Sequence, residues 1–121
     1  MALSYRADGE ILSNQLWLMK KEEQFCDIVL VCGVQGSQRC IKAHRVVLAA
    51  NSNYLMRLLQ ISDSEIITMP SQLDFFHVNR IIDFMYTKDL NFLSWEIDDL
   101  LLVAHFFEMH QLYRGLLNLK K

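Results

Sequence analysis

Phe25-Cys-Asp-Ile-Val-Leu-Val31 is the stretch of sequence that decides the fold. Its β-branched and apolar side chains predict a buried strand over 27–32. The following segment, 33–37, contains two glycines and indicates a turn, so 38–42 returns as the second strand of a hairpin. The chain therefore contains a sheet whose first hairpin lies close to its N-terminal end.

Helical patterns occupy most of the sequence around this hairpin. The stretch Lys42-Ala-His-Arg-Val-Val-Leu-Ala-Ala50 predicts a short helix over 43–50. The next predicted helix spans 53–59, and the Asn51-Ser52-Asn53 break supplies N-cap residues for it. The remaining predicted elements are helices over 97–109 and 111–119, a helix that Ser71 caps, and a short strand over 65–69. The apolar face of the helix after Ser71 is predicted to bury Leu73, Phe76, Ile81, Phe84 and Met85. This order predicts an α+β fold in which helices enclose a small sheet.

A further helix, over 11–24, has an unusual apolar pattern. A helix that lies on one core shows one apolar stripe. Here Leu16, Trp17, Leu18 and Met19 follow one another, so apolar side chains point around most of the helix. We therefore predict that one side packs on the chain's own fold and the other on a second subunit.

Composition excludes several classes of function. The chain has 121 residues and a formal net charge of −2, whereas nucleic-acid surfaces carry a positive excess. No apolar run reaches the roughly 20 residues of a membrane span, and the first ten residues do not resemble a secretory signal. Three cysteines, an odd number, suggest reduced thiols inside the cell. We expect one domain over 1–121, with no nucleic-acid or membrane partner.

No pattern indicates a metal, a cofactor or catalysis. The spacing of Cys26, Cys32, Cys40 and His44 lacks the two close ligand pairs of structural zinc sites. The glycines of the 33–37 turn precede a strand and so do not form a phosphate-binding loop. No serine stands in a nucleophile motif. We predict a non-enzyme without a cofactor, a metal ligand or a catalytic residue.

Two charged residues border the predicted hairpin: Asp27 opens the apolar strand and Arg45 follows the returning one. A hairpin would bring their positions together. Two interpretations remain open on pattern alone: a pair of exposed end charges, or a partly buried couple in which each charge compensates the other.

The sequence closely resembles the BTB/POZ family. The resemblance lies in five motifs: 25–31, 42–50, Ser52-Asn-Tyr54, Asp83-Phe-Met-Tyr-Thr87, and Leu100-Leu-Leu-Val-Ala-His-Phe-Phe-Glu-Met-His110. It covers essentially the whole chain. The resemblance implies a small mixed sheet enclosed by a cluster of short helices over 25–121, with a strand-and-helix extension over 1–24.

The same resemblance implies a dimer. In the longer form of the family, found in zinc-finger transcription factors, an N-terminal strand of one chain pairs with a late strand of the other. Ser4-Tyr-Arg6 and Leu90-Asn-Phe-Leu93 match those two strands, and Asp27 and Arg45 match the family's charged pocket at the dimer interface. The interface residues implied are Ser4, Tyr5, Arg6, Leu12, Leu16, Trp17, Met19, Asp27, Arg45, Leu90, Asn91, Phe92 and Leu93.

We therefore expect a homodimerisation domain of a larger, nuclear transcription regulator, with related domains and co-regulator peptides as further partners. The alternative is a substrate adaptor of a cullin ubiquitin ligase, in the nucleus or the cytoplasm. Cullin-binding members carry a hydrophobic-x-Glu element after the helix that contains Tyr54. The corresponding segment here, 59–63, has no good match to it, and the chain stops before the further helices of Kelch-linked adaptors. The adaptor is therefore the second hypothesis.

Overall fold

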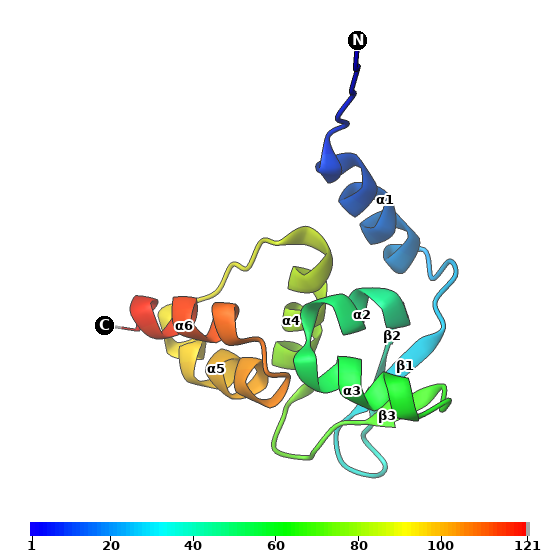
Figure 1. Cartoon of the computed structure of the whole chain (residues 1–121). Coiled ribbons are helices and arrows are strands. Elements are labelled where there is room, and N and C mark those ends of the chain that lie inside the picture. Colours follow the sequence, from blue (N-terminus) through cyan, green and yellow to red (C-terminus); the bar gives the residue numbers. More distant parts are fainter. Residues whose placement is uncertain (121) are drawn as a thin grey trace.

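A computed structural model describes residues 1–120 and has the predicted α+β architecture (Figure 1). Helices gather around a small sheet, while the first helix and the segment before it project from this body. The helices are α1 (Gly9–Lys21), α2 (Arg45–Asn51), α3 (Asn53–Ile61), α4 (Phe75–Thr87), α5 (Ile97–Phe106) and α6 (His110–Leu119), with a 3-10 turn η1 (Ser94–Glu96). The strands are β1 (Ile28–Cys32), β2 (Arg39–Ala43) and β3 (Ile66–Thr68).

The sheet is mixed, with β1 in the middle. Strand β2 pairs with it antiparallel and β3 pairs with it parallel. Alternate β1 residues, Ile28, Leu30 and Cys32, are buried, as expected for a strand with one face on the core. The predicted hairpin is confirmed, and Gly33 is required at its turn. It has φ +106°, and a Cβ there would lie 2.9 Å from the Ser37 carbonyl oxygen.

Of the N-caps predicted for α3 and α4, the first is correct and the second is wrong. Ser52 caps α3, since its Oγ accepts a hydrogen bond from the N–H of Leu55 at 3.0 Å. The predicted cap of α4 at Ser71 is wrong. Residues 71–73 form a turn after Pro70, and Asp74 caps the helix by accepting from the N–H of His77 at 3.1 Å.

Helix boundaries also differ from those predicted. The helix predicted over 97–109 ends at Phe106, because Glu108 has φ +56°, a left-handed conformation that stops a helix. The first helix spans 9–21 rather than 11–24, since Asp8 caps its start. The two predicted outer strands, 4–6 and 90–93, have no regular structure in the single chain. A strand needs a partner, so their pairing between chains stays a prediction.

A buried hydrogen-bond junction at Tyr86 joins three parts of the chain. Its hydroxyl accepts from the backbone N–H of His44 at 2.9 Å and lies 2.8 Å from His44 Nδ1. The Gln24 carbonyl, 2.8 Å from Nε2, can only accept, so Nε2 carries the imidazole proton and donates to it, and Nδ1 of this tautomer accepts from the Tyr86 hydroxyl. Burial raises the pKa of Tyr86 to about 12, which keeps the hydroxyl hydrogen in place. The junction therefore fixes α4, the start of α2 and the segment before β1 to one another.

Replacing this hydroxyl tests the junction. Tyr86→Phe leaves both the backbone N–H and Nδ1 of His44 without a partner in the core. We expect it to lower the free energy of unfolding by about 2 kcal/mol, measured by urea denaturation. Tyr113→Phe, which removes a hydroxyl from the half-buried face of α6, is the matched control and should change stability little. Equal effects of the two substitutions would contradict the role given to Tyr86.

Candidate protein-interaction surface

Helix α1 has no buried residue, although it is rich in apolar side chains. Ile11 is 63% exposed, Leu12 66% and Leu18 45%. Figure 1 shows the helix projecting beyond the rest of the fold, with the chain before it leading away. We call Ile11, Leu12 and Leu18 the outer α1 face. Three large aliphatic side chains on one short helix leave a substantial apolar area in water.

The C-terminal half of α1 is attached to α4. Trp17 packs against Tyr86, with ring centroids 6.1 Å apart, and Lys20 forms an ion pair with Asp83 at 3.3 Å. Leu16 and Met19 are half-buried. The predicted interface residues of this helix therefore divide between two sides: Trp17 packs on its own chain, while Leu12 lies in solvent. Leu18, which the predicted interface omitted, also belongs to the solvent side.

The two segments predicted to exchange between chains differ in their contacts. Residues 1–8 are exposed, with Tyr5 92% accessible. In the late segment, Leu90 and Phe92 pack against the core while Asn91 and Leu93 are exposed. This alternation is that of a half-buried strand. Within residues 1–120, no backbone hydrogen bond joins the two segments. Each segment therefore retains backbone groups that another strand can satisfy.

Asp27 and Arg45 approach each other, but not as an ion pair. The Asp27 carboxylate accepts from the backbone N–H of Arg45 at 2.7 Å, at the first residue of α2. The Arg45 guanidinium instead donates to three carbonyls at the end of α3 and beyond it, those of Leu59, Ser62 and Ser64. The interpretation as a charge-compensated couple within one chain is therefore wrong. Asp27 secures the start of α2, and Arg45 satisfies the negative end of α3.

The cysteines do not assemble a thiolate metal site among the described residues. Cys26 Sγ lies 3.8 Å from His44 Nε2, but that nitrogen donates to a carbonyl and is not available as a ligand. Burial raises the pKa of Cys32 to about 11, which disfavours the thiolate that a metal requires. Cys40 is exposed on β2.

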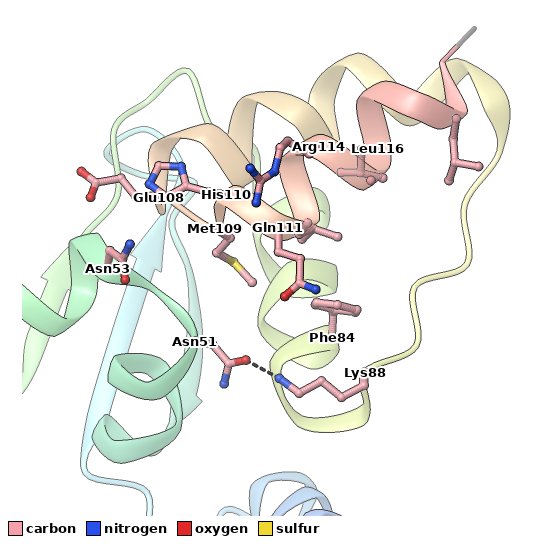
Figure 2. Close-up of a pocket in the computed structure, with 13 residues that line it drawn as sticks. Asn51, Asn53, Phe84, Lys88, Glu108, Met109, His110, Gln111, Arg114 and Leu116 are labelled. Carbon is pink, nitrogen blue, oxygen red and sulfur yellow. Dashed lines mark hydrogen bonds between the residues drawn. The ribbon is translucent and has the colours of Figure 1, made fainter.

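A groove of about 900 Å³ lies between the α2–α3 junction, the end of α4, and α6 (Figure 2). Phe84, Met109, Leu112 and Leu116 supply apolar side chains to it. Polar groups stand at its margin, where Lys88 donates to the Asn51 side chain. No local pattern in the sequence indicates this groove, because its walls come from three separate segments, the outermost of which contain Asn51 and Leu119. None of the helices in the described part of the chain, 1–120, has the length and hydropathy of a membrane-spanning segment.

Comparison with known proteins identifies relatives of this fold. The sequence profile of the BTB/POZ domain matches residues 16–117. The chain is 31% identical over 111 residues to human zinc finger and BTB domain-containing protein 5, which covers 88% of this chain and 16% of that protein. It is 32% identical over 97 residues to protein abrupt of Drosophila melanogaster, covering 78% of this chain and 10% of that protein. The chain thus spans a small part of both relatives.

The structure resembles that of a solved domain over nearly its full length. The BTB domain of zebrafish PATZ1 superposes with a TM-score of 0.86 and covers 98% of this chain, while this chain covers 97% of it. The two sequences are 21% identical. The likeness shows that the two chains share a fold.

The hydrogen bond that Asp27 accepts from the Arg45 backbone can be tested separately from the negative charge of Asp27. We expect Asp27→Ala to lower the free energy of unfolding by about 1 kcal/mol, because the first N–H of α2 loses its acceptor. Asp27→Asn keeps an acceptor oxygen at the same place and should retain most of the stability. Thermal unfolding followed by circular dichroism measures both. If the two variants were equally destabilised, the negative charge rather than the hydrogen bond would matter.

Proposed function

The chain belongs to the BTB/POZ domain family, and we propose that it serves as the self-association domain of a larger transcription regulator. The family is one of protein-interaction modules rather than enzymes. The observation that carries the proposal is the outer α1 face, which is apolar, exposed and continuous with a helix half attached to the fold. The occupant we propose is the same face of a second copy, as a two-fold dimer requires.

The physical reason is that α1 gains too little from its own chain. A free helix of 13 residues is marginal in water. Its C-terminal half is anchored by Trp17 and Lys20, whereas Ile11 and Leu12 contact mainly solvent. Covering these two side chains with a partner's apolar residues would stabilise the N-terminal half, at roughly 25 cal/mol for each Å² removed from water.

Strand exchange would complete the dimer. Residues 4–6 are exposed, and 90–93 already alternate inward and outward side chains as a strand does. Pairing 4–6 of one chain with 90–93 of the other would satisfy backbone groups that the single chain leaves to water. In this proposal Ser4, Tyr5 and Arg6 face the late segment of the partner, and Asp27 and Arg45 lie beside the crossing. The extension then spans 1–24 and the body of the domain 25–121.

The larger context is proposed from the relatives. Human zinc finger and BTB domain-containing protein 5 is by its name a zinc-finger protein, and this chain matches 16% of it. Zinc fingers read DNA through their own helices, which agrees with a domain of net charge −2 that serves association instead. We therefore propose a nuclear regulator in which DNA binding lies in another segment, and in which related domains can replace the second copy.

Co-regulator peptides are the further partners proposed. The groove beside α6 has an apolar floor at Phe84, Met109 and Leu116 and polar side chains at its margin. A short amphipathic peptide fits such a surface, because anchor side chains enter the floor and the margin receives its polar groups.

One observation keeps the cullin-adaptor alternative in view. Ile61, at the end of the helix that contains Tyr54, is 84% exposed, and Asp63 follows two residues later. This is the place of the hydrophobic-x-Glu element, with a carboxylate shorter by one methylene. Binding of the purified chain to a cullin N-terminal fragment distinguishes the two functions. Our proposal expects no stoichiometric complex, whereas tight binding that Ile61→Ala abolishes would establish the adaptor.

Self-association is tested on the outer α1 face. We expect Leu12→Asp to convert a dimer to a monomer, because a carboxylate would be buried without a partner in the interface. Size-exclusion chromatography with light scattering gives the mass. Asn14→Asp adds the same charge to an exposed position of the same helix and should leave the dimer intact.

Leu12 lies outside the core of its own chain, so the monomer should keep its helical circular dichroism. An unchanged mass for Leu12→Asp would contradict the proposed interface. Equal dissociation of both variants would mean that charge on α1, rather than burial of Leu12, controls association.

A further inference from the structure

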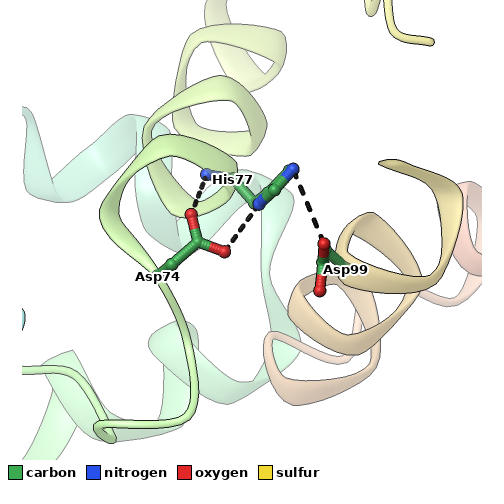
Figure 3. A group of neighbouring side chains, drawn as sticks. All are labelled: Asp74, His77 and Asp99. Carbon is green, nitrogen blue, oxygen red and sulfur yellow. Dashed lines mark hydrogen bonds and ion pairs between the residues drawn. The ribbon is translucent and has the colours of Figure 1, made fainter. Parts of the chain in front are cut away.

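Three carboxylates, those of Asp74, Glu96 and Asp99, surround the side chain of His77 in α4, and Figure 3 shows two of them, Asp74 and Asp99. Asp74 Oδ2 lies 2.6 Å from His77 Nδ1. On the other side of the ring, Nε2 lies 3.3 Å from Glu96 Oε1 and 4.0 Å from Asp99 Oδ2. These groups come from the cap of α4, the turn η1 and the first turn of α5, so the fold brings together residues that are distant in sequence.

The position of the imidazole proton follows from the first of these contacts. The Asp74 carboxylate at 2.6 Å from Nδ1 accepts a hydrogen bond, so Nδ1 carries a proton and Nε2 is the ring nitrogen that could take a metal. His77 is 9% exposed, and its Nε2 is a buried atom with no hydrogen-bond partner. A buried, unpaired nitrogen of this kind is costly. The ring is therefore held with Nε2 directed toward carboxylate oxygens of Glu96 and Asp99.

We propose that His77, Asp99 and Glu96 form a binding site for a divalent transition metal, with Zn²⁺ as the best match. Zinc takes nitrogen at 2.0–2.1 Å and carboxylate oxygen at 2.0–2.2 Å, so two ligand atoms on one tetrahedral ion stand about 3.4 Å apart. The two distances from Nε2, 3.3 and 4.0 Å, bracket this span. A small rotation of the Asp99 side chain, which is 55% exposed, brings its oxygen to the required place.

Asp74 has the role of a supporting residue in this site. A metal-bound histidine commonly donates its other N–H to a carboxylate, which fixes the ring and makes the ligand more basic. Asp74 also accepts the backbone N–H of His77, so its own orientation is set by the start of α4. The pair would hold the ligand nitrogen in position before a metal arrives.

The charge of the site favours a dication, and Arg80 opposes it. Three carboxylates face one guanidinium, because Arg80 pairs with Glu96 Oε1. With the imidazole neutral, as a metal ligand must be, two of these negative charges are left for the ion. The guanidinium nevertheless occupies the Glu96 oxygen that the metal would use, so Arg80 must yield or share it. The other oxygen, Glu96 Oε2, accepts the N–H of Leu93 at 2.8 Å. A bound metal would therefore tie α4 to the turn that follows 90–93.

Calorimetric titration of the whole chain with Zn²⁺, after treatment with a chelator, tests the site. We expect one ion bound per chain. His77→Gln and Asp99→Asn should each weaken binding about tenfold or more, whereas Arg80→Gln should strengthen it, because a competing cation is removed. Weaker Zn²⁺ binding in the two ligand variants together with stronger binding in Arg80→Gln identifies this site. A loss of folded protein would instead weaken binding in every variant. Asp99 is exposed at its side chain, so Asp99→Asn should fold normally even if His77→Gln does not.

The thiols supply the matched control. Cys26→Ser and Cys40→Ser should bind Zn²⁺ with unchanged affinity. Loss of binding in either cysteine variant, with unchanged affinity in Asp99→Asn, would overturn the proposal and assign the metal to the thiols. Absence of stoichiometric binding to the wild-type chain would also overturn it, and would leave the cluster as an ion-pair network that secures the start of α5.

Discussion

The hydroxyl of Tyr86 is the junction on which the arrangement of the chain depends. It holds His44 through a backbone N–H and a ring nitrogen, and His44 in turn holds the carbonyl of Gln24. The same tyrosine ring packs against Trp17 of α1. One side chain thus links α4, the hairpin, the start of α2 and the N-terminal helix. The direction in which α1 leaves the body of the domain follows from this link.

The direction of α1 leaves part of this helix free to associate with another chain. Because the junction anchors only the C-terminal half of α1, the other half carries Ile11 and Leu12 into solvent together with the segment before it. The N-terminal helix is therefore both firmly attached and incompletely covered. Because the chain belongs to a family of protein-interaction domains, we interpret this surface as a dimer interface. The late segment 90–93, whose alternating burial is that of a strand, belongs to the same surface in this proposal.

Local patterns in the sequence predicted the hairpin, the order of the helices and the cap at Ser52, because each depends on neighbouring residues. The α4 cap was misplaced, since Ser71 and Asp74 both suit a cap and only the turn after Pro70 distinguishes them. The pairing of Asp27 with the backbone of Arg45, rather than its guanidinium, depends on how α3 ends and could not be read from spacing. The groove beside α6 and the cluster at His77 are each formed by segments that are distant in the sequence. Local sequence patterns therefore did not predict either of them.

The most direct test of this account is the mass of the unmodified domain in solution. Sedimentation equilibrium over a wide range of concentration measures it without a label or a substitution. We expect a mass twice that of one chain, maintained on dilution until the helical signal of α1 falls together with the dimer. A mass equal to one chain at every concentration, with α1 fully helical, would contradict it.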